Sequence, residues 1–377
     1  MAPLQGLLVL DFSTLLPGPL TSLMLAEAGA DVVKIERPGS GDEMRSYVPK
    51  IDADSVNFHM LNRGKRSLAI DLKASDAVDR LVPLIKLADI VIEQFRPGVM
   101  KRLGLGAEAL QALNPRLIYC SITGWGQTGP KAKRAAHDLN YMAETGLLGL
   151  SGSADGAPVL PPILAADIAG GTMPAVINIL LALRERDRTG QGAVLDIAMA
   201  DSLFTFAYWG LGNGFACGSW PQRGADLVTG GTPRYQIYRT ADLRYLAAAP
   251  LEDRFWDAFC DLIGLESEWR DMRAPVAGAI AAVAARIATR TADEWQVVFG
   301  DRDVCCSLVS DLEQAVADPH VTARGLFERD VAGVGPALPL PIDPRFRAVA
   351  ALDRAPALGA KSASVARRTL DDILNAI

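Results

Sequence analysis

The chain has 377 residues, half of them hydrophobic and 22% charged, so we expect a folded protein of one or two domains rather than a disordered chain. The net charge is −6, yet the first 137 residues carry a small excess of Lys and Arg. That excess is too weak for a nucleic-acid-binding protein and suits one polyanionic small ligand. No CxxC pair occurs among the five cysteines, which favours free thiols in a reducing compartment over a disulfide framework or a zinc site.

The N-terminus and the apolar segments point away from a membrane. Residues 1–5 lack the basic segment of a signal peptide. The longest uncharged apolar stretch, residues 168–183, contains Gly170, Gly171 and Pro174, and we expect it to be too short and too interrupted to span a bilayer. No set of His, Asp and Glu has metal-ligand spacing. We therefore predict a cytoplasmic protein with no metal, no membrane and no nucleic-acid partner.

Short apolar runs alternate with helical patterns along the first half of the chain. Strands are expected at residues 7–11, 31–36, 67–71, 90–93, 117–121 and 194–197. Helices are expected at residues 20–27, 74–87, 107–113 and 171–186. The strands are apolar throughout rather than at alternate positions, which is typical of a parallel, doubly wound sheet buried on both faces.

The pattern changes near residues 212–233, where glycines and prolines accumulate, and we interpret this segment as a linker into a second unit. A hairpin is expected from residues 235–239 and 244–248, followed by helices near 252–263, 277–288 and 292–299. Residues 336–344 are rich in proline and predict an extended linker. A short helix is expected within residues 362–377.

His137 is one of only three histidines, and it stands beside Asp138 just after a glycine-rich stretch. A scarce titratable residue next to a carboxylate is a candidate acid/base centre. Asp167 is a lone acid in an apolar setting thirty residues later. Each has a plainer explanation: His137 could be a structural histidine, and Asp138 and Asp167 could cap helices. Glu252 could be an ordinary first-turn acid.

Gly124, Gly126 and Gly129 match the spacing of a dinucleotide-binding fingerprint, but we reject that interpretation. The glycines should open an apolar helix, whereas Pro130 and a basic stretch follow them. Cations in the predicted loops could instead neutralise the phosphates of a nucleotide-like cofactor, although any single one could be solvated surface. They are Arg37, Arg63, Lys65, Arg66, Lys73, Arg96, Lys101, Arg102, Lys131, Lys133 and Arg134. Without a Walker motif, ATP is not expected.

Taken together, several motifs resemble the class III CoA-transferase superfamily, which includes formyl-CoA transferase, carnitine CoA-transferase and α-methylacyl-CoA racemase. The resemblance covers nearly the whole chain, and its motifs are highly specific in combination. They are the runs at residues 4–11, 17–19, 29–39, 62–68, 96–99, 103–105, 114–119, 124–130 and 189–192.

The resemblance implies an α/β fold: a doubly wound, Rossmann-like large domain built from both chain ends, a smaller α+β middle domain, and an interlocked homodimer. The large domain would take residues 1–200, a linker 201–228, the small domain 229–325, and a linker with the return to the large domain 326–377. The resemblance also implies coenzyme A, bound as an acyl-CoA substrate. The residues implied to contact it are Arg37, Ile70, Asp71, Leu72, Lys73, Arg102, Ala136, Asn140 and Tyr141.

Two chemistries occur in the superfamily. In the transferases, the acid at the position of Asp167 attacks the acyl thioester and forms covalent intermediates. In the racemase, the same acid works opposite a histidine at the position of His137, and the α-proton leaves one face and returns on the other. The racemase supports its acid with an aspartate matching Asp138 and its histidine with a glutamate matching Glu252. All four are present in this sequence.

One departure from the racemase pattern concerns the residue four positions before the acid, which is Ile163 here instead of an asparagine. Backbone N–H groups would then have to stabilise the thioester oxygen. We predict a 2-methylacyl-CoA racemase or epimerase. The alternatives are a CoA-transferase with Asp167 as nucleophile and Gly230-Gly231 as a mobile loop, and, more distantly, a non-catalytic CoA-binding subunit. Leu243 also replaces a glycine that relatives have in the predicted hairpin.

Overall fold

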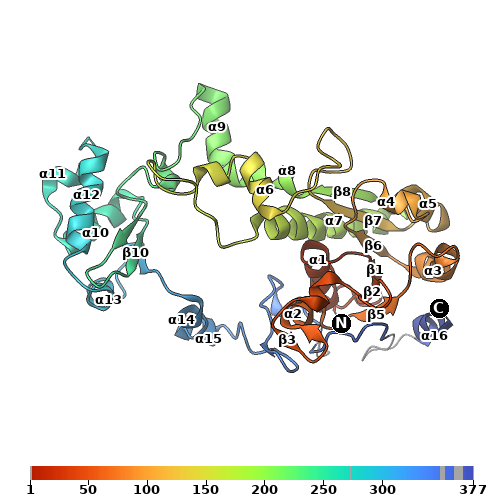
Figure 1. The fold of residues 1–377 in the computed structure, drawn as a ribbon. Helices are drawn as coiled ribbons and strands as arrows, with labels where there is room; N and C mark the ends of the chain where they lie inside the picture. The colour runs from red at the N-terminus through yellow and green to blue at the C-terminus, as the bar shows by residue number, and fades with distance from the viewer. Residues whose placement is uncertain (1, 272, 349–352, 361–367, 377) are drawn as a thin grey trace. The chain divides into compact units, whose positions relative to one another are not determined.

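The computed structural model describes residues 2–271, 273–348, 353–360 and 368–376 (Figure 1). Its contacts divide the chain into two compact units. Unit 1 comprises Met1–Thr145, Ile163–Phe206 and Arg324–Ile377, and unit 2 comprises Gly146–Pro162 and Ala207–Ala323. The chain therefore leaves unit 1 twice and ends in it.

Unit 1 is built on a six-stranded parallel sheet with the order β5-β2-β1-β6-β7-β8. The strands are β1 (Leu8–Asp11), β2 (Asp31–Glu36), β5 (Arg66–Ala69), β6 (Ile90–Glu93), β7 (Ile118–Thr123) and β8 (Val194–Ala198). All six confirm strands expected from the sequence. When the six strands are numbered 1 to 6 along the chain, their order in the sheet is 3-2-1-4-5-6, as in doubly wound folds. The direction of this order reverses between β1 and β6.

Helices cover both faces of this sheet, as continuous strand hydrophobicity requires. On one face, α3 (Ala77–Leu87), α5 (Ala107–Leu113) and α16 (Arg368–Ala376) share a hydrophobic core with β1, β2 and β5. On the other face, α1 (Pro17–Glu27) and α7 (Met173–Thr189) pack on the strands. Leu10 and Val91, at the centre of the sheet, are fully buried.

The remaining elements of unit 1 are short, and one further 3-10 turn, η4 (Phe204–Ala207), crosses the boundary between the units. Those of unit 1 are η1 (Glu43–Ser46), β3 (Lys50–Ile51), β4 (Asp54–Ser55), α2 (Val56–Asn62), α4 (Val99–Arg102), α6 (Asp138–Glu144), η3 (Ala166–Thr172), α8 (Met199–Leu203), β12 (Asp330–Val331), β13 (Gly335–Pro336) and η6 (Pro344–Phe346). The helix predicted within residues 362–377 corresponds to α16, and residues 361–367 lie outside the described part.

One expectation about the apolar stretch 168–183 is wrong. Gly170, Gly171 and Pro174 do not interrupt it, because a π-helical segment, η3, continues directly into α7. The resulting helix, Ala166–Thr189, has 24 residues and is apolar enough, by length and composition alone, to cross a membrane. Here it packs against α1, β7 and β8, and core helices of soluble folds pass the same criterion.

Unit 2 contains a three-stranded antiparallel sheet of β9 (Gln236–Arg239), β10 (Tyr245–Ala248) and β11 (Cys306–Leu308). The pairing of β9 with β10 confirms the predicted hairpin. A core with Trp256, Phe259 and Trp295 lies between the sheet and its helices. The other elements are η2 (Leu148–Leu150), α9 (Tyr208–Cys217), η5 (Leu227–Thr229), α10 (Asp253–Ile263), α11 (Ser267–Arg270), α12 (Val276–Ile287), α13 (Ala292–Phe299), α14 (Leu312–Val316) and α15 (Pro319–Ala323).

Candidate active site

Two cavities open at the carboxyl-terminal edge of the unit 1 sheet, where the strand order reverses between β1 and β6. Ligands of open α/β sheets bind at such positions, because the loops on either side diverge and leave a crevice. The loop after β1 contributes Ser13 to the first cavity and Leu16 to the second. Phe95, in the loop after β6, lines both.

The first cavity, of about 310 Å³, contains six residues that the sequence analysis assigned to a nucleotide. These residues are Arg37, Ile70, Asp71, Leu72, Lys73 and Arg102. Ile70 is buried, whereas the three cations are exposed. Within the described residues, no ion pair or side-chain hydrogen bond occupies Arg37, Lys73 or Arg102. Their positive charge is therefore available to a ligand phosphate.

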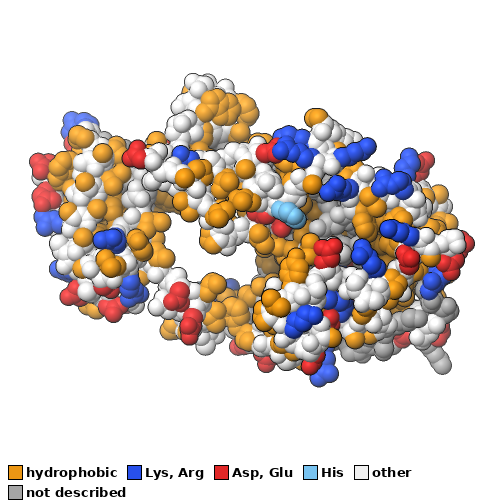
Figure 2. All heavy atoms as spheres, in the orientation of Figure 1, with side chains coloured by type: hydrophobic (Ala, Val, Ile, Leu, Met, Phe, Trp, Pro, Cys, Tyr) orange, Lys and Arg blue, Asp and Glu red, His pale blue; other side chains and the backbone are white. Residues whose placement is uncertain are grey.

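The second cavity, of about 380 Å³, brings His137 and Asp167 to one space. Ala136, Asn140 and Tyr141, which the family resemblance implies to flank the thioester, also line it. An apolar wall faces them, made of Leu15, Leu16, Pro17, Ile122 and Met199. Arg96 and Arg134 line the same cavity, and Arg134 pairs with Glu144. Figure 2 shows the basic side chains that gather on the side of unit 1 where α4, α5 and the loop before α6 lie.

Asp167 is the second residue of η3, and its backbone N–H donates to Asp138 Oδ2 at 3.0 Å. Asp138 is buried, so its carboxylate lies beside the backbone of Asp167 in a poorly solvated place. Burial, and then the charge of Asp138, raise the pKa of Asp167 to about 6, with His137 opposing the rise. A carboxyl with this pKa can both accept and return a proton near neutral pH.

Neither acid is the N-cap of its own helix. Asp138 does not cap α6, because His137 holds that position, and the Asp138 carboxylate accepts the Asp167 N–H. Asp167 is not an N-cap, since Ala165 holds that position. His137 itself precedes α6, and its backbone N–H donates to Asn140 Oδ1 at 3.0 Å. The hydroxyl of Tyr141 donates to the carbonyl of Ala136, which fixes the chain just before His137.

Several cations proposed as phosphate partners are instead part of the protein's own ion pairs. Arg63, Lys65 and Arg66 are buried and pair with Glu27, Asp11 and Asp371. Lys131 and Arg134, in the loop before α6, both pair with Glu144 at the end of that helix. The expectation that the loop cations together neutralise the phosphates of a cofactor is therefore wrong for the three buried residues.

The loop after β1 is held by a buried group of charges. Lys34 Nζ lies 2.8 Å from Asp42 Oδ2 and donates to the carbonyl of Ser13 at the same distance. Asp42 Oδ1 accepts the Leu15 N–H at 3.1 Å, although Leu15 has a left-handed backbone with φ +63°. Burial lowers the pKa of Lys65 to about 7. Burial alone would raise the pKa of Asp11, but the charges of Lys34 and Lys65 lower it to about 2. These contacts fix a loop that lines both cavities.

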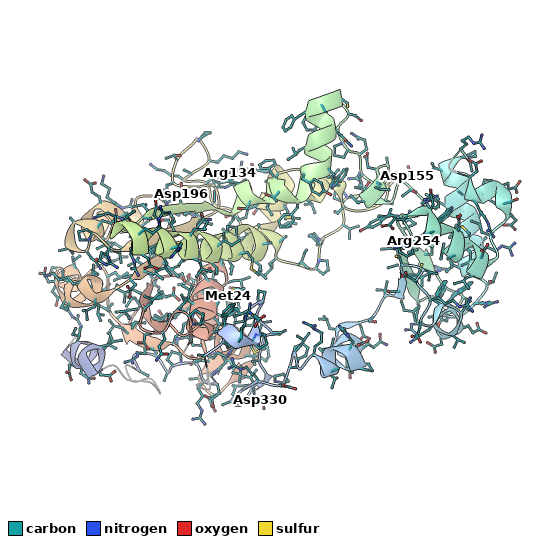
Figure 3. The ribbon with its side chains drawn as sticks, turned by 180° about the vertical axis from the view of Figure 1, so that it is seen from behind. Met24, Arg134, Asp155, Asp196, Arg254 and Asp330 are labelled. Carbon is teal, nitrogen blue, oxygen red and sulfur yellow. The ribbon has the colours of Figure 1, made fainter. Side chains whose placement is uncertain are left out.

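The glycine-rich stretch after β7 forms a loop and not the start of a helix. This agrees with our rejection of the dinucleotide-binding interpretation. The next helix, α6, begins fourteen residues after Gly124, at Asp138. Gly126 has φ +81°, and the following Gln127 N–H donates to Asp196 at 2.9 Å. Asp196 lies on β8 and is labelled in Figure 3. Trp125 packs edge-on against Tyr141, so this loop forms a rim of the second cavity.

The remaining candidates lie elsewhere. Glu252 is exposed and precedes α10 in unit 2, so its pairing with His137 stays a prediction. His59 and His320 line neither cavity. Among the residues that the structure describes, no group of three His, Cys, Asp or Glu side chains could hold a metal ion.

Sequence reasoning missed several residues that line the two cavities. Ser13, Leu15, Leu16, Phe95 and Met199 line the cavities without belonging to any titratable motif. The order of the strands would have identified the loops after β1 and β6, but a sequence pattern does not supply strand order. The apolar wall around the acids was therefore outside the reach of motif analysis.

Comparisons with known proteins identify the family. The profile of CoA-transferase family III matches residues 4–362. The alpha-methylacyl-CoA racemase of Mus musculus is 36% identical over 97% of this chain and 92% of its own length. The acetyl-CoA:oxalate CoA-transferase of Acetobacter aceti is 33% identical over 90% of this chain and 89% of its own.

A solved structure extends this likeness to the fold. The CAIB/BAIF family protein of Brucella suis superimposes with a TM-score of 0.81 and 32% identity, covering 95% of this chain and 97% of that one. Sequence and structure therefore agree over nearly the full length, and the chain belongs to CoA-transferase family III.

Proposed function

We propose that this enzyme is a 2-methylacyl-CoA racemase or epimerase in which His137 and Asp167 are the two acid/base groups. The single observation that carries the proposal is the second cavity, which places both side chains in one space beside a buried carboxylate. Two groups of different type can hold opposite protonation states, as removal and return of one proton require. The raised pKa of Asp167, about 6, suits that task.

Coenzyme A fits the two adjoining cavities by charge. Arg37, Lys73 and Arg102 in the first cavity have no partner within the described residues and would meet the phosphates of the nucleotide. Arg96, also without a partner there, lies in the second cavity. The thioester would then lie beside Asp167, with the acyl chain against the apolar wall formed by Leu15, Leu16 and Met199.

In the proposed reaction, one of the two groups takes the α-proton and the other returns a proton on the opposite face. When the Asp167 carboxylate is the base, the C–H bond breaks, its electron pair delocalises onto the thioester oxygen, and an O–H bond forms on Asp167. The N–H bond of protonated His137 then breaks, its proton forms a C–H bond with the enolate electron pair on the opposite face, and the thioester is regenerated. The reverse direction exchanges these roles, so the two protonation states alternate.

The second candidate is a CoA-transferase, because relatives of this chain include the acetyl-CoA:oxalate CoA-transferase. In that chemistry, Asp167 attacks the thioester carbonyl, and His137 has no direct role. The loop at Gly230-Gly231, predicted to be mobile in this chemistry, lies in unit 2, where the Gly231 N–H donates to the Asp226 carbonyl at 2.9 Å.

An exposed apolar face in unit 1 supports the predicted homodimer. On α7, Ile177, Leu180 and Leu181 are 45–63% exposed, and Phe204 and Phe206 follow α8 with similar exposure. Apolar patches of this kind mark protein–protein contacts. We propose that a second copy of the chain covers this face, which light scattering on the purified protein would test.

Deuterium exchange separates the two chemistries. A 2-methylacyl-CoA incubated with the enzyme in D₂O, with no acceptor acid, is expected to gain deuterium at the α-carbon and to lose stereochemical purity. Asp167→Asn should abolish inversion, and His137→Gln should abolish inversion while leaving exchange from one enantiomer. Each loss is expected to be on the order of 10²–10⁴-fold.

A transferase would give a different pattern. It would show no exchange, an acceptor-dependent product, and an adduct on Asp167 that hydroxylamine cleaves, and His137→Gln would retain activity. That result would replace the racemase by the transferase. Binding of acyl-CoA without either activity would support the non-catalytic alternative.

A further inference from the structure

We propose that Gly170, Gly171 and Thr172 are positioning residues that hold the acid Asp167 by keeping η3 in its wide, π-helical form. The inference rests on the proposed function only for the importance of Asp167, since both candidate chemistries use this acid. Its structural basis lies entirely within unit 1.

A π-helical segment of seven residues is unusual, because such turns are rare and occur mostly as single bulges at functional sites. The sequence supplies a local reason for this one. Pro174 follows η3 and has no N–H, so the carbonyl of Gly170 lacks the donor that an α-helix would place four residues later. An α-helix would lack this hydrogen bond as well, so the change to π-helical geometry loses one hydrogen bond fewer here than in a helix without proline.

Tertiary contacts then seat the segment against the first residue of α8. A Cβ on Gly170 would lie 2.3 Å from the backbone oxygen of Met199, closer than any real contact, and a backbone atom cannot move aside by rotation. A Cβ on Gly171 would lie 3.0 Å from Met199 Cγ and 3.3 Å from Pro17 Cβ. Only hydrogen fits at Gly170, whereas the neighbours of Gly171 are side-chain atoms.

A third contact fixes the end of the segment. The hydroxyl of Thr172 donates to the carbonyl of Pro17 at 2.8 Å, and Thr21 donates to the same carbonyl at 2.7 Å. Thr172 and Gly170 are fully buried or nearly so. Pro17 and Met199 both line the second cavity, so the contacts that seat η3 also join it to two of that cavity's walls.

The consequence appears one turn earlier, at Asp167, whose N–H meets Asp138 Oδ2 at 3.0 Å. If η3 narrowed to an α-helix, Asp167 would rotate about the helix axis and lose this partner. The titratable groups around Asp167 are Asp138, His137 and Tyr141. Because the negative charge of Asp138 contributes to the raised pKa of Asp167, rotation away from it lowers that pKa below about 6.

The test compares Gly170→Ala with Gly212→Ala, a glycine in α9 whose added Cβ would meet nothing within 4 Å. Gly170→Ala is expected to lower kcat on the order of 10²-fold through misplacement of the acid, with KM for the acyl-CoA unchanged. NMR titration of labelled aspartate should show a lower pKa for Asp167, and the Asp167 amide should exchange faster. Gly212→Ala should match the wild type. A Gly170→Ala protein with wild-type kcat and Asp167 titration would overturn the proposal.

A second set of variants covers the case in which Gly170→Ala does not fold. Gly171→Ala should show the same defect in milder form. When Met199 is already alanine, adding Gly171→Ala should cause little further loss of kcat, because the side chain that the new Cβ would meet is gone. Thr172→Val should lower kcat without raising KM. No relief by Met199→Ala, together with normal Thr172→Val kinetics, would also refute the idea. If the wild type shows neither exchange nor transfer, the proposed function fails, but the titration and amide exchange still decide the positioning role.

Discussion

The carboxyl of Asp167 is half-buried beside a second carboxylate, an arrangement that serves proton transfer and opposes folding. Its pKa of about 6 exceeds the ordinary value of 3.8. Between these two values the native state binds more protons at this site than the unfolded chain does. The free energy of unfolding therefore falls as the pH rises from about 4 to about 6, and the loss persists at higher pH.

Asp167→Asn should reverse this loss while it abolishes activity. The amide keeps the shape and carries no charge, so the variant should be more stable than the wild type at pH 8, by roughly 1–3 kcal/mol. At pH 4 the two proteins should unfold alike, since Asp167 is then protonated in the wild type. Urea unfolding at both pH values measures the difference. Asp155→Asn, at an exposed aspartate, is the control, and a stability gain that does not vary with pH would contradict the argument.

At the scale of elements, the sequence was sufficient for the strands and the main helices of unit 1, because their hydrophobic pattern is set by burial alone. The glycines led to a wrong expectation at η3, where Gly170 and Gly171 lie inside a continuous helix and allow close packing. The grouping of His137, Asp138 and Asp167 followed from family motifs. The apolar wall and the free cations depend on strand order and on which charges pair internally, and neither is encoded in a local pattern.

The turn between β9 and β10 offers a direct test of backbone strain. Leu243 adopts φ +66°, its N–H donates to the Thr240 carbonyl at 3.1 Å, and its side chain is 64% exposed. A left-handed backbone is unfavourable for a residue with a Cβ. Leu243→Gly should therefore stabilise the protein by about 0.5–1 kcal/mol, because removal of the strain outweighs the added flexibility of the unfolded chain.

Thermal unfolding of Leu243→Gly and Leu243→Ala separates strain from side-chain loss. The alanine variant keeps the Cβ, so it should unfold like the wild type. Equal stabilisation by both substitutions would mean that the exposed leucine side chain, and not the backbone, is unfavourable. The hydrogen bond that the Ala292 N–H donates to Asp242 Oδ1, at 3.0 Å, should survive in both variants.

At the scale of the whole molecule, the chain must return to unit 1 after 117 residues, Ala207 to Ala323, in unit 2. Glu27, at the end of α1, holds the returning segment. It accepts hydrogen bonds from Arg63 at 2.7 Å and from Arg329, and its backbone carbonyl accepts the Ala348 N–H. Glu27 and Arg63 are each only 2% exposed, whereas Arg329 is 38% exposed.

Glu27→Gln should destabilise unit 1 by about 3 kcal/mol, because it leaves the Arg63 guanidinium buried without a counter-charge. Arg329→Gln should cost only about 1 kcal/mol, since its charge is part-exposed, and should mainly speed amide exchange in residues 324–348. Urea unfolding and hydrogen exchange measure these effects. The double variant Glu27→Gln with Arg63→Met should be less destabilised than Glu27→Gln alone, because no unpaired buried charge remains. A double variant worse than the single one would show that packing around α1, and not charge, fastens the returning chain.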